Sequence, residues 1–193
     1  MIRIIDKLRK LNFPVTEYIA LEFFARDGSW QTKSYGKEMN ELYLWEIDKK
    51  YEHALKKNFP EAKVSIGDSY KISKKEHFRE KFNFIVFDNP QGIYAEYCEH
   101  FEALPLVTAL SKKESFIIFN VNKKPFNYEE NLDWKSRRNN YYGIDATNLT
   151  SSFILIFYKN LFSSLGFKVL DIFEEKRNKE YLSYLVLRLE KFC

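Results

Sequence analysis

Short apolar runs rich in β-branched and aromatic residues recur along this chain, and segments with helical spacing separate them. The seven runs cover residues 18–24, 42–45, 63–66, 82–87, 115–121, 167–173 and 181–189. The fourth run is apolar at every position from Phe84 to Phe87, which is typical of a strand buried on both faces of a parallel sheet. Strands that alternate with helices predict right-handed crossovers and a doubly wound sheet with helices on both faces.

The last two runs break this alternation. Only the seven residues 174–180 join them, whereas a parallel crossover needs about a dozen residues or more. The two runs must therefore pair as an antiparallel hairpin. We predict an α/β fold built on a mostly parallel, seven-stranded sheet that ends in a C-terminal antiparallel hairpin.

Helical spacing predicts helices over residues 2–12, 49–58, 94–110 and 149–165, with Pro105 kinking the third and Gly166 ending the fourth. The segment 122–148 fits neither pattern, because it is polar and rich in rings. Structureless segments of this length are often lids or binding loops. We therefore expect one domain over residues 1–193, with an N-terminal helix within 1–13 and an insertion or lid at about 122–148.

Composition excludes several classes of protein. The chain has 193 residues, 45% hydrophobic and 30% charged, which is the composition of one globular domain. Its two cysteines and three histidines do not cluster, so we expect no metal site, no disulfide and a reducing, cytoplasmic setting. No apolar run reaches about 18 residues, so we expect no membrane span. The net charge of +4 is compatible with a nucleic-acid partner without requiring one.

Acidic residues stand near the ends of the first four runs, where parallel strands would bring them to one edge. The first run reads A-L-E-F-F-A-R-D-G-S-W over residues 20–30, with Glu22 and Gly28 as its acid and glycine. The second run continues into Glu46, Ile47 and Asp48. The third is followed by Gly67, Asp68 and Ser69, and the fourth by Asp88, Asn89, Pro90 and Gln91.

In strand order and motif order, nearly the whole chain resembles the class I S-adenosylmethionine-dependent methyltransferase family. The resemblance implies S-adenosyl-L-methionine as cofactor, with Glu22 beside its ammonium, Gly28 where a helix begins near its carboxylate, and Glu46 accepting the ribose hydroxyls. Asp68 would accept from the adenine amino group, or could simply cap a helix. The expected cofactor-binding residues are Glu22, Phe24, Ala25, Asp27, Gly28, Trp30, Glu46, Ile47, Asp68 and Ser69. Phe24 and Arg26 stand where the family often has glycine.

The turn after the fourth run looks like a variant of the Asp/Asn-Pro-Pro-Tyr motif of enzymes that methylate amino nitrogens. The resemblance implies that Asp88, Asn89 and Pro90 are catalytic, with the polar side chain and a backbone carbonyl accepting hydrogen bonds from the target amine. Asn89 and Gln91 replace the second residue and the aromatic of that motif. Gln91 and Tyr94 are expected to contact substrate, with the ring of Tyr94 replacing the missing aromatic; a simple turn is the alternative.

Two partners are compatible with this interpretation. Trp134, Arg137 and Arg138, within the segment 122–148, could stack on bases or contact phosphates of a nucleic acid. Alternatively the segment is a lid over a small-molecule substrate, or a solvated insertion. The chain is therefore interpreted as a methyltransferase of an amino nitrogen on a nucleic acid or another planar substrate; the alternative is a non-catalytic binding or scaffold protein that kept the fold.

Overall fold

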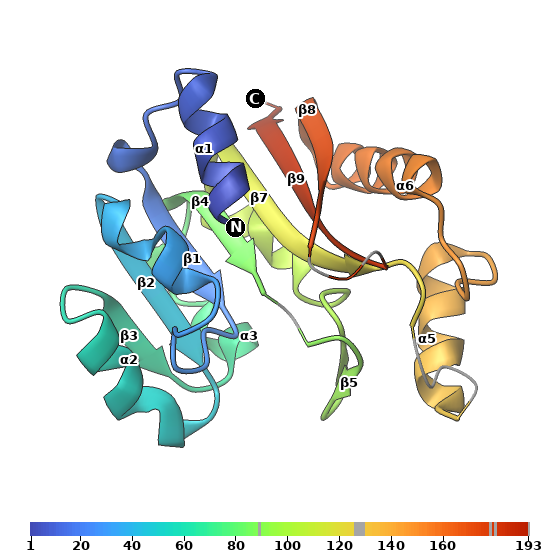
Figure 1. Cartoon of the computed structure of the whole chain (residues 1–193), viewed down its shortest axis with the longest axis horizontal. Coiled ribbons are helices and arrows are strands. Elements are labelled where there is room, and N and C mark those ends of the chain that lie inside the picture. Colours follow the sequence, from blue (N-terminus) through green and yellow to red (C-terminus); the bar gives the residue numbers. More distant parts are fainter. Residues whose placement is uncertain (89, 126–129, 178, 180, 193) are drawn as a thin grey trace.

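Seven strands form one sheet in the order β3-β2-β1-β4-β7-β9-β8 (Figure 1). This computed structural model describes residues 1–88, 90–125, 130–177, 179 and 181–192. The strands are β1 (Ile19–Phe23), β2 (Glu41–Glu46), β3 (Lys63–Ile66), β4 (Phe82–Phe87), β7 (Ser111–Asn122), β8 (Phe167–Lys176) and β9 (Leu182–Lys191). Strands β1, β2, β3, β4 and β7 pair in parallel, and β9 runs antiparallel to both β7 and β8. The predicted fold class and the C-terminal hairpin are confirmed.

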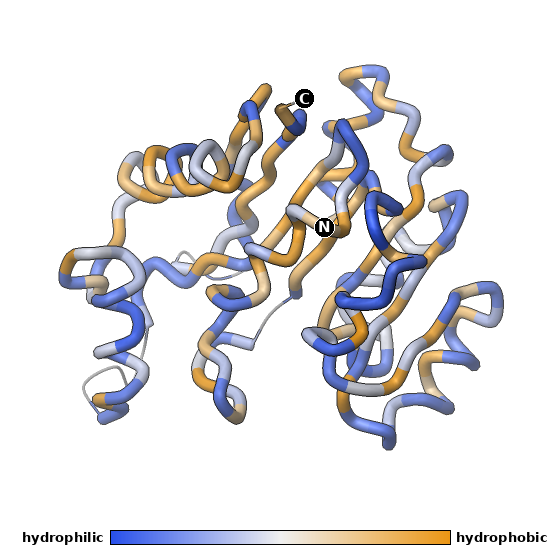
Figure 2. Tube along the Cα trace, turned by 180° about the vertical axis from the view of Figure 1, so that it is seen from behind, coloured by the Kyte–Doolittle hydropathy of each residue, from blue (hydrophilic) through white to orange (hydrophobic). Residues whose placement is uncertain are grey.

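Helices cover both faces of this sheet. They are α1 (Ile2–Lys10), α2 (Glu52–Asn58), α3 (Ser69–Ile72), α4 (Val107–Leu110), α5 (Leu132–Tyr142) and α6 (Ser151–Ser164). Helices α1 and α2 pack on one face and contribute residues such as Leu8 and Leu55 to its core. Helices α3 to α6 pack on the other, where Tyr158 and Phe162 lie against Phe119 of β7. In Figure 2 the hydrophobic colour follows the central strands and α6, while α2 and most connections are hydrophilic.

Local sequence explains where the best-predicted helices start and stop. Thr150 caps α6 by accepting a hydrogen bond from the backbone N–H of Phe153 at 3.2 Å. The chain leaves that helix at Gly166, whose φ of 88° is left-handed. In α1 the buried stripe is Ile4, Ile5 and Leu8. The expected helix therefore forms, but it ends before Leu11, which is 51% exposed.

The helix expected over residues 94–110 is wrong except for its last turn. The chain instead forms a small antiparallel hairpin, β5 (Ile93–Tyr94) with β6 (Tyr97–Cys98), then turns, and α4 covers only the end. Ala95 and Glu99 adopt left-handed φ angles of 51° and 50°, which a helix interior excludes. The hairpin lies beyond the end of β4 (Figure 1).

Two further segments differ from expectation. The connection from β1 to β2 has no α-helix, only the 3-10 turns Thr32–Ser34 and Gly36–Glu38. Within the expected insertion, the structure forms helix α5, capped by Asn131, whose side chain accepts from the Trp134 N–H at 3.0 Å. The buried positions of α5 are Trp134, Arg138 and Tyr142. Because the middle residue of its buried face is an arginine, the spacing of apolar residues does not predict this helix.

Candidate active site

A cavity of about 530 Å³ opens at the carboxyl ends of β1, β2, β4 and β7. Strand order reverses between β1 and β4, and crevices at such points are where open α/β sheets bind ligands. Ten of the residues expected from the sequence line it: Glu22, Phe24, Ala25, Trp30, Glu46, Ile47, Asp88, Pro90, Gln91 and Tyr94. Sequence reasoning missed eight others: Arg26, Thr32, Asp48, Lys50, Tyr51, Asn120, Arg177 and Leu182. Asn89 lies outside the described residues.

The loop after β1 keeps a left-handed backbone at alternate residues. Phe24, Arg26 and Gly28 have φ angles of 60°, 49° and 69°. Left-handed φ costs a residue other than glycine about 1–2 kcal/mol. Two hydrogen bonds to strand β2 hold the loop in this shape. The Ala25 N–H donates to the backbone oxygen of Trp45 at 3.1 Å, and the Arg26 N–H donates to Glu46 Oε2 at 2.7 Å. The backbone at Phe24 and Arg26 thus has a conformation usually adopted by glycine, although both residues carry large side chains.

Gly28 and Asp27 support this loop from outside the cavity. A Cβ on Gly28 would lie 2.4 Å from Cε2 of Phe59, so packing against this ring favours glycine at this position. Asp27 accepts from the backbone N–H of Ser29 at 3.1 Å and from its hydroxyl at 2.8 Å. The helix expected to begin near Gly28 is absent, so the structure places no α-helix N-terminus at that point of the described chain.

Glu46 is the acid at the end of β2, and it is 5% exposed. Its two carboxylate oxygens accept separate backbone hydrogen bonds: Oε2 from Arg26 and Oε1 from Asp48, the latter at 2.9 Å. Each carboxylate oxygen can accept two hydrogen bonds, so both retain capacity for a ligand hydroxyl. Ile47 is 42% exposed beside it. An acceptor next to an exposed apolar side chain matches a ribose joined to a flat base.

Glu22, at the end of β1, is 2% exposed. The hydroxyl of Tyr35 donates to its Oε2. Burial raises the pKa of Glu22 to about 8, although hydrogen bonds from Tyr35 and Thr32 act in the opposite direction. The carboxyl is therefore mostly protonated at pH 7. In this state it accepts the hydrogen bond from Tyr35 and does not offer a negative charge to an ammonium group.

Asp88 follows β4 and is held by side chains from β7, from β9 and from the residue that follows β8. Its Oδ1 accepts from Asn120 Nδ2 at 2.6 Å, from Arg177 Nη1 at 3.0 Å and from the hydroxyl of Tyr184 at 3.3 Å. Arg177 Nη1 also donates to Asn120 Oδ1 at 2.5 Å. Asn120 and Tyr184 face each other on the paired strands β7 and β9. Asp88 is thus the centre of a polar network that spans the carboxyl edge.

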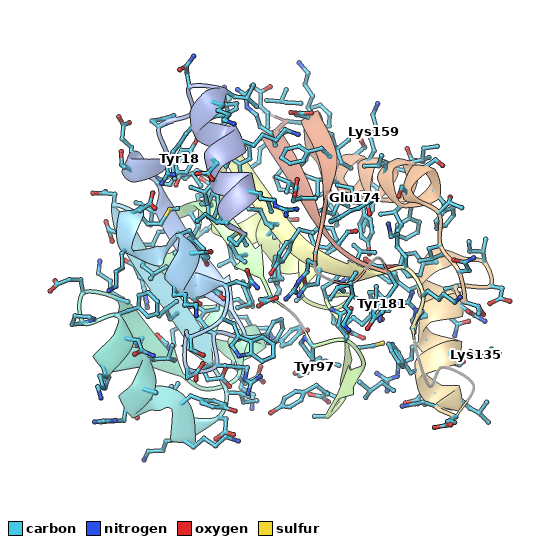
Figure 3. The ribbon with its side chains drawn as sticks, viewed as in Figure 1. Tyr18, Tyr97, Lys135, Lys159, Glu174 and Tyr181 are labelled. Atoms are coloured by element: carbon cyan, nitrogen blue, oxygen red, sulfur yellow. The ribbon has the colours of Figure 1, made fainter. Side chains whose placement is uncertain are left out.

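Rings and cations surround the mouth of the cavity. The guanidinium of Arg26 lies 4.6 Å from the ring centre of Trp30 and 5.6 Å from that of Tyr51, both within cation–π range. Trp30 is 56% exposed and Tyr94 is 46% exposed. Tyr97 and Tyr181 lie near the carboxyl ends of the parallel strands (Figure 3), although neither lines the cavity. A planar molecule that enters here meets aromatic faces.

Asp68 and Ser69 do not line the cavity. Asp68 caps α3 by accepting from the backbone N–H of Tyr70 at 2.9 Å, which is the helix-cap alternative stated for it. Ser69 is buried in the first turn of α3. The ring of Tyr70 stacks on that of Tyr97 with centres 3.9 Å apart, so this turn supports the β5–β6 hairpin.

Trp134 and Arg138 are buried on α5, whereas contact with a substrate would require them to be exposed. Glu99 Oε1 accepts from Trp134 Nε1 at 2.9 Å and from Arg138 Nη1, and the side chains of Arg138 and Glu99 are both fully buried. Arg137 lies on the surface and donates to the backbone oxygen of Glu96 at 2.7 Å. The expected substrate contacts by Trp134 and Arg138 are therefore corrected to a structural role, because protein atoms enclose both side chains.

Other kinds of site are not seen in the described part of the chain. No helix there is both long and apolar enough to cross a membrane. The histidine, cysteine and acidic side chains described include no group of three arranged to hold a metal ion.

Solved structures resemble the chain over almost its whole length, although its sequence matches no protein-family model and no curated protein. The fibrillarin pre-rRNA processing protein of Methanococcus jannaschii is 14% identical with a TM-score of 0.60, over 93% of this chain and 70% of that one. TYW2 of M. jannaschii in complex with AdoMet is 13% identical with a TM-score of 0.54, over 97% and 76%. Magnesium protoporphyrin IX methyltransferase (ChlM) from Synechocystis PCC 6803 with bound SAH is 10% identical with a TM-score of 0.59, over 98% and 81%. With its strand order and its reversed β9, this chain has the fold of the class I S-adenosylmethionine-dependent methyltransferases.

Proposed function

We propose that this protein is an S-adenosylmethionine-dependent methyltransferase that binds its cofactor in the cavity at the carboxyl edge. The observation that carries the proposal is Glu46, which stands at the end of β2 beside a loop with left-handed backbone at Phe24, Arg26 and Gly28. Solved structures of this fold include complexes with AdoMet and SAH. The cofactor, when bound, supplies a methyl group on a positively charged sulfur.

The residues present fit this cofactor. The volume of about 530 Å³ is within the range of about 300–1,000 Å³ that small-molecule sites occupy. Glu46 would accept hydrogen bonds from the ribose hydroxyls, and Ile47 would lie against the adenine. Phe24 and Arg26 line the same cavity, so their side chains would contact the cofactor.

The proposed substrate carries an amino nitrogen on a planar ring. Asp88 and Pro90 line the cavity together with Gln91 and Tyr94. Asp88 would accept a hydrogen bond from the amine, and the ring of Tyr94 would stack on the substrate. Transfer from a sulfonium needs mainly alignment of the reacting atoms, and that is what these side chains would supply. We also propose that Asn89, which lies outside the described residues, belongs to the catalytic turn with Asp88 and Pro90. Asp27 and Gly28 are proposed to support the cofactor loop.

The cofactor proposal is tested by replacing Glu46 with alanine. We expect affinity for S-adenosylhomocysteine, measured by titration calorimetry, to fall by about 1–3 kcal/mol, or about 5- to 150-fold, because two charge-assisted acceptors are lost. Glu41→Ala is the matched control, since Glu41 stands at the opposite end of the same strand and pairs with Lys63 at the surface. Equal affinity of Glu46→Ala and wild type would remove Glu46 from the cofactor site.

A nucleic acid is the first substrate class to test, because fibrillarin, one of the similar structures, is a pre-rRNA processing protein. Lys50 and Arg26 line the cavity and could meet phosphates. If RNA binds here through several phosphates, its dissociation constant should rise by at least about tenfold between 50 and 200 mM salt. Fluorescence anisotropy with a labelled single-stranded RNA measures this. Salt-independent binding, or none, would favour a small planar substrate.

A non-catalytic binding or scaffold protein is the second candidate. Two observations favour it: Phe24 and Arg26 stand where the methyltransferase resemblance places glycine, and no α-helix lies between β1 and β2. A folded wild-type protein that binds neither S-adenosylmethionine nor S-adenosylhomocysteine would support this candidate over the enzyme.

A further inference from the structure

The three hydrogen bonds to the Asp88 side chain all reach the same oxygen. Asn120, Arg177 and Tyr184 each donate to Oδ1. Among the described residues, none donates to Oδ2, and the Asp88 side chain is 10% exposed in the wall of the cavity. An ionised carboxylate can only accept hydrogen bonds, so Oδ2 is the oxygen left to receive an N–H or O–H donor of a ligand.

The donors that hold Oδ1 are themselves fixed. Arg177 Nη1 is shared between Asp88 and Asn120 Oδ1, and its guanidinium lies 4.7 Å from the ring centre of Tyr184. Asn120 and Tyr184 stand on the central strands β7 and β9, whereas Arg177 follows β8. A guanidinium stays protonated and planar. The C-terminal hairpin therefore supplies a permanent positive charge and a fixed direction to a carboxylate on β4.

We propose that Arg177 is a positioning residue for substrate. Together with Asn120 and Tyr184 it fixes Oδ1 of Asp88 by hydrogen bonds, and this orients Oδ2 of Asp88 toward an exocyclic amine of the substrate. This inference rests on the proposed function, because it assumes that the cavity holds cofactor and substrate together. The chemistry favours a planar group with an amino donor, such as adenine or cytosine. The same position disfavours a carbonyl oxygen, because it would face a carboxylate oxygen without a proton between them.

Binding of nucleosides in the presence of saturating S-adenosylhomocysteine tests this inference. Adenosine and cytidine carry the amine, whereas inosine and uridine carry a carbonyl in its place. We expect wild type, followed by NMR titration, to prefer each amino-bearing nucleoside over its partner. Arg177→Met should lose about tenfold of that preference, the effect of misdirecting one charge-assisted hydrogen bond, and Arg177→Lys should restore part of it.

The controls separate the possible failures. Arg188→Met is the matched variant, because Arg188 also belongs to this hairpin but pairs with Glu114 at the surface; it should keep the wild-type preference. Titration of each variant with S-adenosylhomocysteine alone tests the cofactor site, and failure of wild type in that titration refutes the proposed function itself. If wild type binds the cofactor product but shows no preference for amines, or if Arg177→Met keeps the preference, the role of Arg177 is refuted. A variant that only loses thermal stability, with its preference unchanged, also refutes it.

Discussion

Replacing Arg138 with alanine is expected to lower the free energy of unfolding by about 3–5 kcal/mol, the cost of leaving one charge of a buried pair alone. Arg138 and Glu99 are both fully buried, and Arg138 Nη2 also donates to the backbone oxygen of Asn122 at 2.8 Å. The substitution leaves the buried Glu99 carboxylate without its positively charged partner. It also removes the hydrogen bond that joins α5 to the end of β7. Urea denaturation monitored by circular dichroism measures the loss.

Two variants make this prediction specific. Arg137→Ala removes the neighbouring arginine, whose side chain is on the surface, and should change the free energy of unfolding by less than about 1 kcal/mol. The double variant Glu99→Leu with Arg138→Met removes both charges and should recover part of the loss, since an apolar pair avoids the desolvation of two ions but also removes the hydrogen bonds to Trp134 Nε1 and the Asn122 carbonyl. If Arg138→Ala unfolds at the same urea concentration as wild type, the buried pair contributes nothing to stability.

The second large effect concerns pH. Burial raises the pKa of Glu22 from its ordinary value of 4.5 to about 8, so the folded protein binds a proton that the unfolded chain releases. From this group, stability is greatest below about pH 4.5 and falls by about 1.4 kcal/mol per pH unit until the pH passes the folded pKa. We expect the free energies of unfolding of wild type and Glu22→Gln to diverge by about 3–4 kcal/mol between pH 5 and pH 8, with the variant gaining relative to wild type.

The difference between the two proteins isolates Glu22, because every other titrating group is common to both. Urea denaturation at pH 5, 6, 7 and 8 gives the two curves. Glu114→Gln is the control, since that carboxylate is 57% exposed on β7 and should leave the pH dependence as it is in wild type. Parallel curves for wild type and Glu22→Gln would mean that the buried carboxyl is ionised throughout this range.

The fold could be predicted because its information is local. Runs such as Phe84 to Phe87 are apolar on every residue, and the short link between the last two strands allows only one direction of pairing. The failures have physical causes as well. Residues 94–110 contain enough apolar side chains to resemble a helix. They form a hairpin instead, in which Tyr97 stacks on Tyr70, and no pattern within residues 94–110 predicts this contact. Helix α5 was missed because the centre of its buried face is Arg138, whose partner Glu99 is 39 residues away.

The candidate site divides in the same way. Glu22, Glu46 and Asp88 could be placed at the cavity because each stands at the end of its own predicted strand. Arg177 could not, since its contact with Asp88 joins residues 89 positions apart. Asn120 did leave a signal: it is the single polar residue in the run 116–121, close to the end of a buried strand. A lone amide in that place indicates a partner across the sheet edge.

The left-handed loop after β1 has a consequence for redesign. At Phe24 and Arg26 the chain already has a left-handed backbone that glycine adopts without cost, so exchanging either residue for glycine leaves the main-chain route unchanged and relieves conformational strain. The capacity of the binding chamber can thus be adjusted by single substitutions while its framework stays in place. Under the proposed function, this loop is the natural starting point for accepting cofactor analogues with bulkier transferable groups.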